Sequence, residues 1–167
     1  KQLNLDSCKI GDEGIIEISQ SIIKLNSSLT ILNLSGNIIG IEGGISIGNS
    51  LKYNTTLKIL HLSYNTIQNE GIISISQSLI NNNNSNCCYL NELYLSNILI
   101  SREGIISLSK SLLLNTTIHT LDISLNNIYL EEESSNSIFN ELLKINTTIT
   151  NLNVEWCDIS SSSSIKV

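Results

Sequence analysis

The sequence contains six copies of one pattern, and this repeat constrains the fold more than any single residue does. Each copy has two apolar residues separated by one variable residue, and the copies begin at Leu3, Leu32, Leu60, Leu93, Leu121 and Leu152. The intervals of 28 to 33 residues are long enough to hold both a strand and a helix. Because such a unit cannot bury its apolar face alone, neighbouring units must stack into an elongated solenoid.

The first part of each copy is typical of a short strand that ends in a turn. The two apolar residues point to one face of the strand, and the residue between them points to the other face. Three positions after the second apolar residue lies a slot held by Cys8, Asn37, Asn65, Ile98, Asn126 and Cys157. Buried backbone groups need partners where the chain turns, and an Asn amide or a Cys thiol in this slot supplies them.

The second part of each copy has helical periodicity. Apolar residues recur four and eight positions after a Glu-Gly pair, which places them on one helix face. These residues are Ile18 and Ile22, Ile47 and Leu51, Ile75 and Leu79, and Leu108 and Leu112. Small serines are expected where helices approach each other: Ser19, Ser21, Ser76, Ser78, Ser109 and Ser111. The pattern predicts six parallel strands and five helices, of which the fifth starts late because its copy lacks the Glu-Gly pair.

The complete pattern resembles the leucine-rich repeat family, in its ribonuclease-inhibitor-like subclass with repeats of about 28 residues. The resemblance extends from residue 1 to about residue 160. It implies an α/β fold: a right-handed solenoid in the shape of a horseshoe, with a parallel sheet on the concave face and helices on the convex face. It also implies that the Asn and Cys slot forms a ladder along the solenoid. We expect residues 1–167 to form a single domain of about six repeats that is part of a longer solenoid or protein.

Charge and hydropathy exclude several classes of partner. The net charge is -6 and the nine basic residues are scattered, which argues against binding to nucleic acid or to an anionic membrane through charge. No apolar run approaches the roughly 18 residues that span a bilayer. We therefore expect a cytoplasmic protein that binds neither nucleic acid nor membrane.

The cysteines and sequons give no sign of secretion. Cys8 and Cys157 lie far apart in the repeat, and the adjacent Cys87 and Cys88 lack zinc spacing to other ligands, so we expect four free thiols. Sequons of the form Asn-Ser-Ser or Asn-Thr-Thr begin at Asn26, Asn54, Asn115 and Asn146. They coincide with the turn that closes each unit, so their number follows from duplication of the repeat.

Catalytic and metal-binding constellations are not apparent. No nucleophile can be assigned to His61 or His119, and the run Glu131–Glu133 is explained by a solvated helix start better than by a metal site. Arg102 is the only arginine. Some proteins of the subclass activate the small GTPase Ran with a loop arginine and an acidic tail, and such a tail is lacking here. We expect no enzyme activity, cofactor or metal; the alternatives are a GTPase activator of this kind and the ligand-sensing repeat segment of a nucleotide-binding receptor.

The inner face of the sheet is where the resemblance places a protein partner. The candidate partner-binding residues on that face are His61, Tyr64, Tyr94, Asp122, Leu125, Glu155 and Trp156. Aromatic side chains of this kind often anchor interfaces, and the face carries acidic but almost no basic groups. We expect a protein scaffold whose partner presents basic and apolar groups. The alternative is that these positions are solvent-facing residues without a specific role.

Overall fold

The computed structural model of the chain describes residues 1–25, 28–80, 89–128 and 141–157. Six strands form one parallel sheet in chain order: β1 (Gln2–Asn4), β2 (Ile31–Asn33), β3 (Ile59–His61), β4 (Glu92–Tyr94), β5 (Thr120–Asp122) and β6 (Asn151–Asn153). Residues from the same slot of the repeat lie opposite each other, as Leu32 does to Leu60. The prediction of six parallel strands in register is therefore confirmed.

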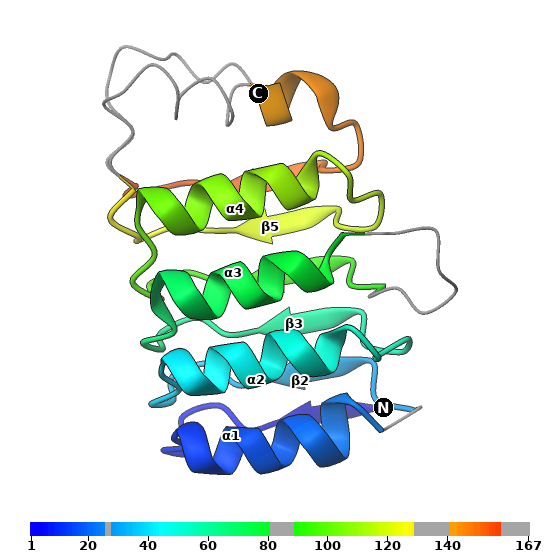
Figure 1. Cartoon of the computed structure of the whole chain (residues 1–167), viewed down its shortest axis with the longest axis vertical. Helices are drawn as coiled ribbons and strands as arrows, with labels where there is room; N and C mark the ends of the chain where they lie inside the picture. Colours follow the sequence, from blue (N-terminus) through cyan, green and yellow to red (C-terminus); the bar gives the residue numbers. More distant parts are fainter. Residues whose placement is uncertain (26–27, 81–88, 129–140, 158–167) are drawn as a thin grey trace.

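Helices cover one side of this sheet (Figure 1). They are α1 (Asp12–Ile18), which continues into the π-helical turn η1 (Ser19–Ile23), then α2 (Ile41–Leu51), α3 (Gln68–Ser78) and α4 (Arg102–Leu112). Residues 141–145 are also helical, but the predicted late start of this fifth helix and the run Glu131–Glu133 lie outside the described residues. The fold is the expected right-handed solenoid, with the sheet on its concave face and the helices on its convex face.

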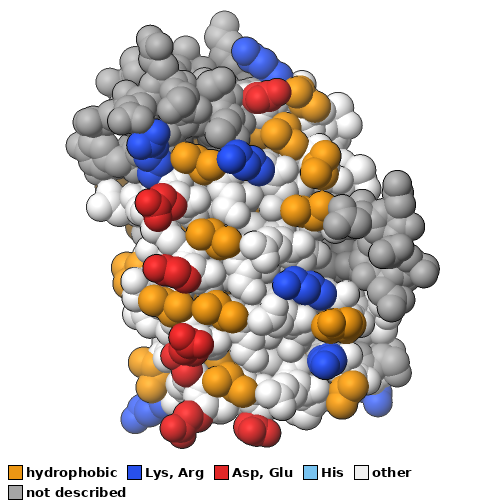
Figure 2. Space-filling model, viewed as in Figure 1, with side chains coloured by type: hydrophobic (Ala, Val, Ile, Leu, Met, Phe, Trp, Pro, Cys, Tyr) orange, Lys and Arg blue, Asp and Glu red, His pale blue; other side chains and the backbone are white. Residues whose placement is uncertain are grey.

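Acidic residues mark the first turns of the helices. Glu13, Glu42, Glu70 and Glu103 are exposed there, and Figure 2 shows acidic side chains in a column along the side where the helices of Figure 1 begin. The positive end of the helix dipole favours a carboxylate at this position by roughly 0.3–1 kcal/mol. This column is a consequence of the repeated Glu-Gly pair.

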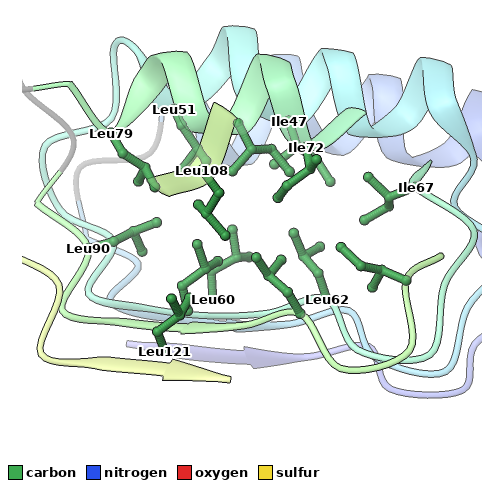
Figure 3. Packing of buried hydrophobic residues seen from close by; sticks show 14 of the residues in the cluster. Ile47, Leu51, Leu60, Leu62, Ile67, Ile72, Leu79, Leu90, Leu108 and Leu121 are labelled. Atoms are coloured by element: carbon green, nitrogen blue, oxygen red, sulfur yellow. The ribbon is translucent and has the colours of Figure 1, made fainter. Parts of the chain in front are cut away.

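The core lies between the sheet and the helices (Figure 3). The interior strands contribute fully buried leucines such as Leu60 and Leu62, and the helices contribute Ile47, Leu51 and Leu108, which are also 0% exposed. The figure shows these side chains pointing toward one another from the two layers. The residues predicted four and eight positions after the glycine are buried in α2, α3 and α4, as the periodicity required.

The first helix departs from that periodicity. Ile18 is only half-buried, and the buried side chain at the end of the segment is Ile23, which is 1% exposed. A π turn contains more residues than an α turn, so η1 moves the buried position along the chain. The side chain of Ile22, which the prediction placed in the core, lies outside the described atoms. The prediction for Ser21 is wrong, because Ser21 is exposed and its hydroxyl donates to the carbonyl of Glu17 at 2.6 Å.

Small residues allow α2 and α3 to approach closely. A Cβ atom on Gly48 would lie 2.5 Å from the backbone carbonyl carbon of Ser74, and one on Gly44 would lie 2.9 Å from the Cα atom of Gly71. The other serines that were predicted at helix contacts are buried: Ser19, Ser76, Ser78, Ser109 and Ser111. Larger side chains at these positions would separate the helices and open the core.

An asparagine ladder joins successive turns at the ends of the strands. The amide of Asn65 donates to the carbonyls of Leu34 at 3.0 Å and Leu62 at 2.8 Å, and its Oδ1 atom accepts the N–H of Ile39 at 3.0 Å. Asn37 and Asn126 make equivalent bonds. Each of these asparagines therefore bonds its own turn and the preceding turn, as the resemblance implied.

Cys8 and Cys157 occupy the ladder position in the first and sixth turns, where a thiol makes fewer hydrogen bonds than an asparagine amide does. The thiol of Cys157 donates to the carbonyl of Ile123 in the preceding turn at 3.1 Å, whereas Cys8 is exposed and contacts only the carbonyl of Asp6. Both are free thiols. Cys87 and Cys88 lie outside the described residues, so the expectation of four free thiols remains a prediction for them.

The fourth turn carries Ile98 in the ladder slot, and the third turn compensates. Ile98 is fully buried, and its N–H donates to Oδ1 of Asn126 at 3.0 Å. Ile98 has no side-chain amide that could donate to the third turn. Instead, Gln68 of the third turn adopts a φ of 59°, and its N–H donates to the carbonyl of Ile98 at 3.0 Å. The equivalent residues Gly40 and Ser101 have φ values of -96° and -121°. Leu99, which follows Ile98, also has a positive φ of 63°, so the backbone changes in the fourth turn as well as in its neighbour.

A second asparagine ladder closes the opposite end of the second, fourth and fifth units. The Asn115 amide donates to the carbonyl of Leu79 in the preceding unit at 2.8 Å, and its Oδ1 atom accepts the N–H of Ile118 at 2.8 Å. Asn54 and Asn146 make the same kinds of contact. Asn54 and Asn115 are only 3% and 2% exposed, so these sequon amides are structural groups. Asn26 lies outside the described residues.

We predict that Asn65→Leu lowers the free energy of unfolding by about 1–3 kcal/mol, because the backbone groups of Leu34, Ile39 and Leu62 lose their buried partner. Urea unfolding measures this difference. Asn49→Leu is the matched control, since Asn49 is an exposed asparagine of α2. Equal stability of the Asn65 variant and the parent would contradict the role of the ladder.

We predict that Ser76→Ala stabilises the fold by about 1 kcal/mol, because its buried hydroxyl has no hydrogen-bond partner among the described residues. Replacing serine by alanine within a helix also raises helix propensity. Ser46→Ala is the control for this effect, because Ser46 is a half-buried serine of α2. The difference between the two variants in thermal or urea unfolding isolates the cost of the buried hydroxyl. A Ser76 variant no more stable than the control would show that the hydroxyl is satisfied.

Candidate partner-binding face on the sheet

The variable residues of the repeat form one column across the open side of the sheet. Strand register places Asn4, Asn33, His61, Tyr94, Asp122 and Asn153 opposite one another in turn. These side chains are half-buried or exposed, whereas the apolar residues beside them in the interior strands are buried. The structure therefore brings together three of the predicted site residues, His61, Tyr94 and Asp122, as neighbours.

Four members of this column have a structural task. The side-chain oxygen of each accepts the backbone N–H two residues later, which closes the turn after the strand. The distances are 3.0 Å at Asn4, 3.0 Å at Asn33, 2.9 Å at Asp122 and 3.1 Å at Asn153. Asn or Asp at these positions is thus explained by the fold itself.

His61 and Tyr94 interrupt this arrangement with a stacked aromatic pair. Their ring centroids are 4.3 Å apart and their planes differ by 10°. Tyr94 offers no oxygen to the turn that follows it; the N–H of Ser96 instead donates to the hydroxyl of Ser63 at 3.1 Å. The turn after Tyr94 therefore closes without help from its own column residue, and the aromatic pair is not explained by turn closure.

Glu92 adds a carboxylate to the pair. The Tyr94 hydroxyl donates to Oε2 of Glu92 at 2.7 Å. Burial, the hydrogen bond to Glu92 and the charges of Glu92 and Asp122 raise the pKa of Tyr94 to about 12. Burial lowers the pKa of His61, and the charge of Glu92 partly opposes this. At neutral pH the pair is therefore an uncharged tyrosine stacked on an imidazole that favours its neutral form.

Sequence reasoning did not identify Glu92 as a site residue. The available signal was its position two residues before Tyr94 in the same strand, which places both side chains on one face. The other histidine, His119, is exposed and lies beside Asn91, so the two histidines do not form a common site.

A second column follows the strands in left-handed backbone conformation. Its members have φ values between 50° and 65°, and they are Ser7, Gly36, Tyr64, Asn97, Leu125 and Trp156. Only a glycine adopts this conformation without cost, and other residues lose on the order of 1–3 kcal/mol. Tyr64, Leu125 and Trp156 are nevertheless 55%, 42% and 82% exposed. Neither burial nor backbone preference explains these large side chains.

Four of the predicted site residues line two separate hollows. One of about 500 Å³ is lined by Tyr94, Asp122 and Glu155, together with Thr120, Asn151 and Asn153. Another of about 290 Å³ is lined by Tyr64 with Asn97 and Leu99. His61, Leu125 and Trp156 line neither of these two hollows. A larger hollow of about 750 Å³ lies between α1 and α2 on the helix side, away from the predicted site.

Among the described residues no group of three or more His, Cys, Asp or Glu side chains is placed to hold a metal ion. No helix within the described part of the chain is long and apolar enough to cross a membrane.

Comparisons with known proteins agree with this architecture. A solved structure titled "Leiomodin-1 Actin-Binding Site 2 (ABS2)" superposes with a TM-score of 0.61 at 18% sequence identity, covering 92% of this chain and 69% of that one. No curated protein matches the chain. A sequence model for the leucine-rich repeat matches residues 1–19, 25–48, 53–76, 114–129 and 146–163, which is more than half of the chain. The chain therefore belongs to the leucine-rich repeat family.

Proposed function

We propose that this chain is a non-enzymatic, cytoplasmic binding module that holds a protein partner on the concave face of its sheet. The observation that carries the proposal is the stacked pair of His61 and Tyr94, which interrupts a column otherwise occupied by turn-closing Asn and Asp residues. Aromatic side chains on an accessible face are the groups that most often anchor a protein interface.

The second column supports the same surface. Tyr64, Leu125 and Trp156 combine exposure with a backbone conformation that is unfavourable for their type. The left-handed backbone occurs in all six units and belongs to the repeat; what the fold does not explain is a large exposed side chain at these three positions. We propose all seven residues predicted from the sequence as partner-binding residues, with Glu92 as an addition.

The charge of the face favours a partner with basic and apolar groups. Asp122 and Glu155 line the hollow of about 500 Å³ beside Tyr94, and no lysine or arginine lines it. An acidic surface of this kind steers and orients a basic partner, whereas buried aromatic groups supply most of the affinity.

The comparisons support the general class of function. The leiomodin-1 structure carries an actin-binding site in its title, so a fold of this kind serves protein binding in that protein. At 18% identity the likeness extends to the fold, and the partner of this chain is a separate question. We also propose that residues 1–167 form one domain of the ribonuclease-inhibitor-like subclass, which three of the five repeat intervals, at 28 or 29 residues, favour.

We predict that Tyr94→Ala weakens partner binding by about 2 kcal/mol or more, because Tyr94 lies at the centre of the proposed surface. The partner is first isolated by affinity capture with the parent chain, and its dissociation constant is then measured by calorimetry. Tyr94→Phe keeps the ring and removes the bond to Glu92, so it separates stacking from the carboxylate contact.

Lys52→Ala is the control for this experiment, because Lys52 is exposed at the end of α2 on the helix side. It should leave the affinity unchanged. Loss of binding in the Lys52 variant, with Tyr94→Ala and Trp156→Ala still binding as the parent does, would place the interface on the convex face instead.

A further inference from the structure

The outer face of the helix layer carries a groove between its first two helical segments. This hollow of about 750 Å³ is lined on one side by Ile16 of α1 and Gln20 of η1, and on the other by Ile45, Ser46 and Asn49 of α2. The two isoleucines are half-buried, so the floor of the groove is apolar and partly uncovered. Lining residues within each segment lie three or four positions apart, so each wall is one helix face and the groove follows the helices.

Two large apolar side chains lie exposed at one end of the groove. Leu25 and Tyr53 are 74% and 58% exposed, and both line the hollow. The Nζ atom of Lys24 lies 5.0 Å from the centre of the Tyr53 ring, so a cation–π contact orients the ring without burying it. Neither Leu25 nor Tyr53 packs against the core, and the fold therefore does not account for their size.

The two ends of the groove carry opposite charges. Glu42 lines it in the first turn of α2, whereas Lys24 and Lys52 line it at the ends of η1 and α2. The Lys52 ammonium donates to Oδ1 of Asn49 at 3.0 Å, which holds it over the groove. Lys52 follows Glu42 by ten positions, a separation of about 15 Å along the helix axis. Figure 2 shows this separation on the helix side, with acidic side chains where the helices begin and basic side chains where α1 and α2 end.

The neighbouring helices of the solenoid do not compensate these charges. Helices α1 to α4 all run in the same direction, so their acidic first turns lie side by side (Figures 1 and 2). An antiparallel helix would instead place its last turn beside Glu42 and its first turn beside Lys24 and Lys52. The helix dipole favours basic residues in a last turn and acidic residues in a first turn. A helix with ordinary end charges therefore complements this groove in the antiparallel direction only.

We propose that the groove between α1 and α2 binds an amphipathic helix of a partner protein, antiparallel to α2, with acidic residues in its first turn and basic residues in its last turn. Its apolar residues recur every three or four positions and pack against Ile16, Ile45 and Tyr53. An amphipathic helix that lays its apolar face into a groove is a common mode of peptide recognition. This surface goes beyond the proposed function, because it lies on the convex side and leaves the concave face open.

The test uses two synthetic peptides of about 14 residues, or four helical turns. The first carries acidic residues in its first turn, leucines along one face and lysines in its last turn. The second has the same composition with the acidic and basic residues exchanged, and the same internal crosslink keeps both peptides helical. Binding to the isotope-labelled chain 1–167 is followed by NMR titration at low salt.

The first peptide should shift the amide signals of Ser46 and Asn49. The second should bind about tenfold more weakly, because each attractive charge contact at the surface becomes repulsive. Added salt should reduce this difference, since exposed charges are screened.

Exchanging the charges of the groove should exchange its preference between the peptides. The variant combines Glu42→Lys with Lys24→Glu and Lys52→Glu, all at exposed positions. The matched control combines Glu103→Lys with Lys110→Glu, which reverses exposed charges at the two ends of α4, outside the groove. The control should keep the preference of the parent, and circular dichroism checks that both variants are folded.

Tyr94→Ala should bind the first peptide as the parent does, so the groove and the concave face are tested separately. Equal binding of the two peptides, binding of neither, signal shifts confined to the concave face, or an unchanged preference in the charge-exchanged variant would overturn the proposal. Shifts of Ser46 and Asn49 that depend on the concentration of the chain alone would assign the groove to a second copy and would also overturn it.

Discussion

The bond between a buried asparagine amide and the backbone of two successive turns is the interaction on which this structure depends. Asn65 shows it fully, with donors and acceptors directed to its own turn and to the preceding one. Asn115 and its equivalents repeat the arrangement at the opposite end of the second, fourth and fifth units. The second and fifth units, which carry both asparagines, are therefore fixed at both ends, and a short three-residue strand is enough to keep the sheet in register.

Fixed turns have a direct consequence for the concave face. Because the ladders and the buried leucines determine the path of the chain, the residue between the two apolar positions is free of packing constraints. Column residues then serve either turn closure, as Asp122 does, or another purpose, as the His61 and Tyr94 pair does. The scaffold thus separates the residues that determine the fold from those available for recognition.

Much of this arrangement could be predicted from the sequence, because each position of the repeat occurs several times and its residue type can be compared among the copies. The strands, the register, the first ladder and the concave column follow from such slots. Single events could not be predicted in this way: the π turn that moves the buried position to Ile23, and the change of Gln68 to a left-handed conformation opposite Ile98. Both are local responses to packing and to a missing amide, and within the described parts of the chain no second copy repeats them. The bond from Tyr94 to Glu92 likewise occurs only once.

Features of a repeat protein can be distinguished by the number of units that carry them. A feature present in nearly every unit, such as the acidic column at the helix starts in Figure 2, is explained by the physics of the unit, here the helix dipole. A feature that only one or two units carry needs its own cause. Some departures, such as Ile98, are compensated by backbone changes in their own turn and in the neighbouring turn. The exposed Trp156 and the stacked His61 and Tyr94 have no such structural compensation, which is why we propose recognition for them and assign architecture to the repeated slots.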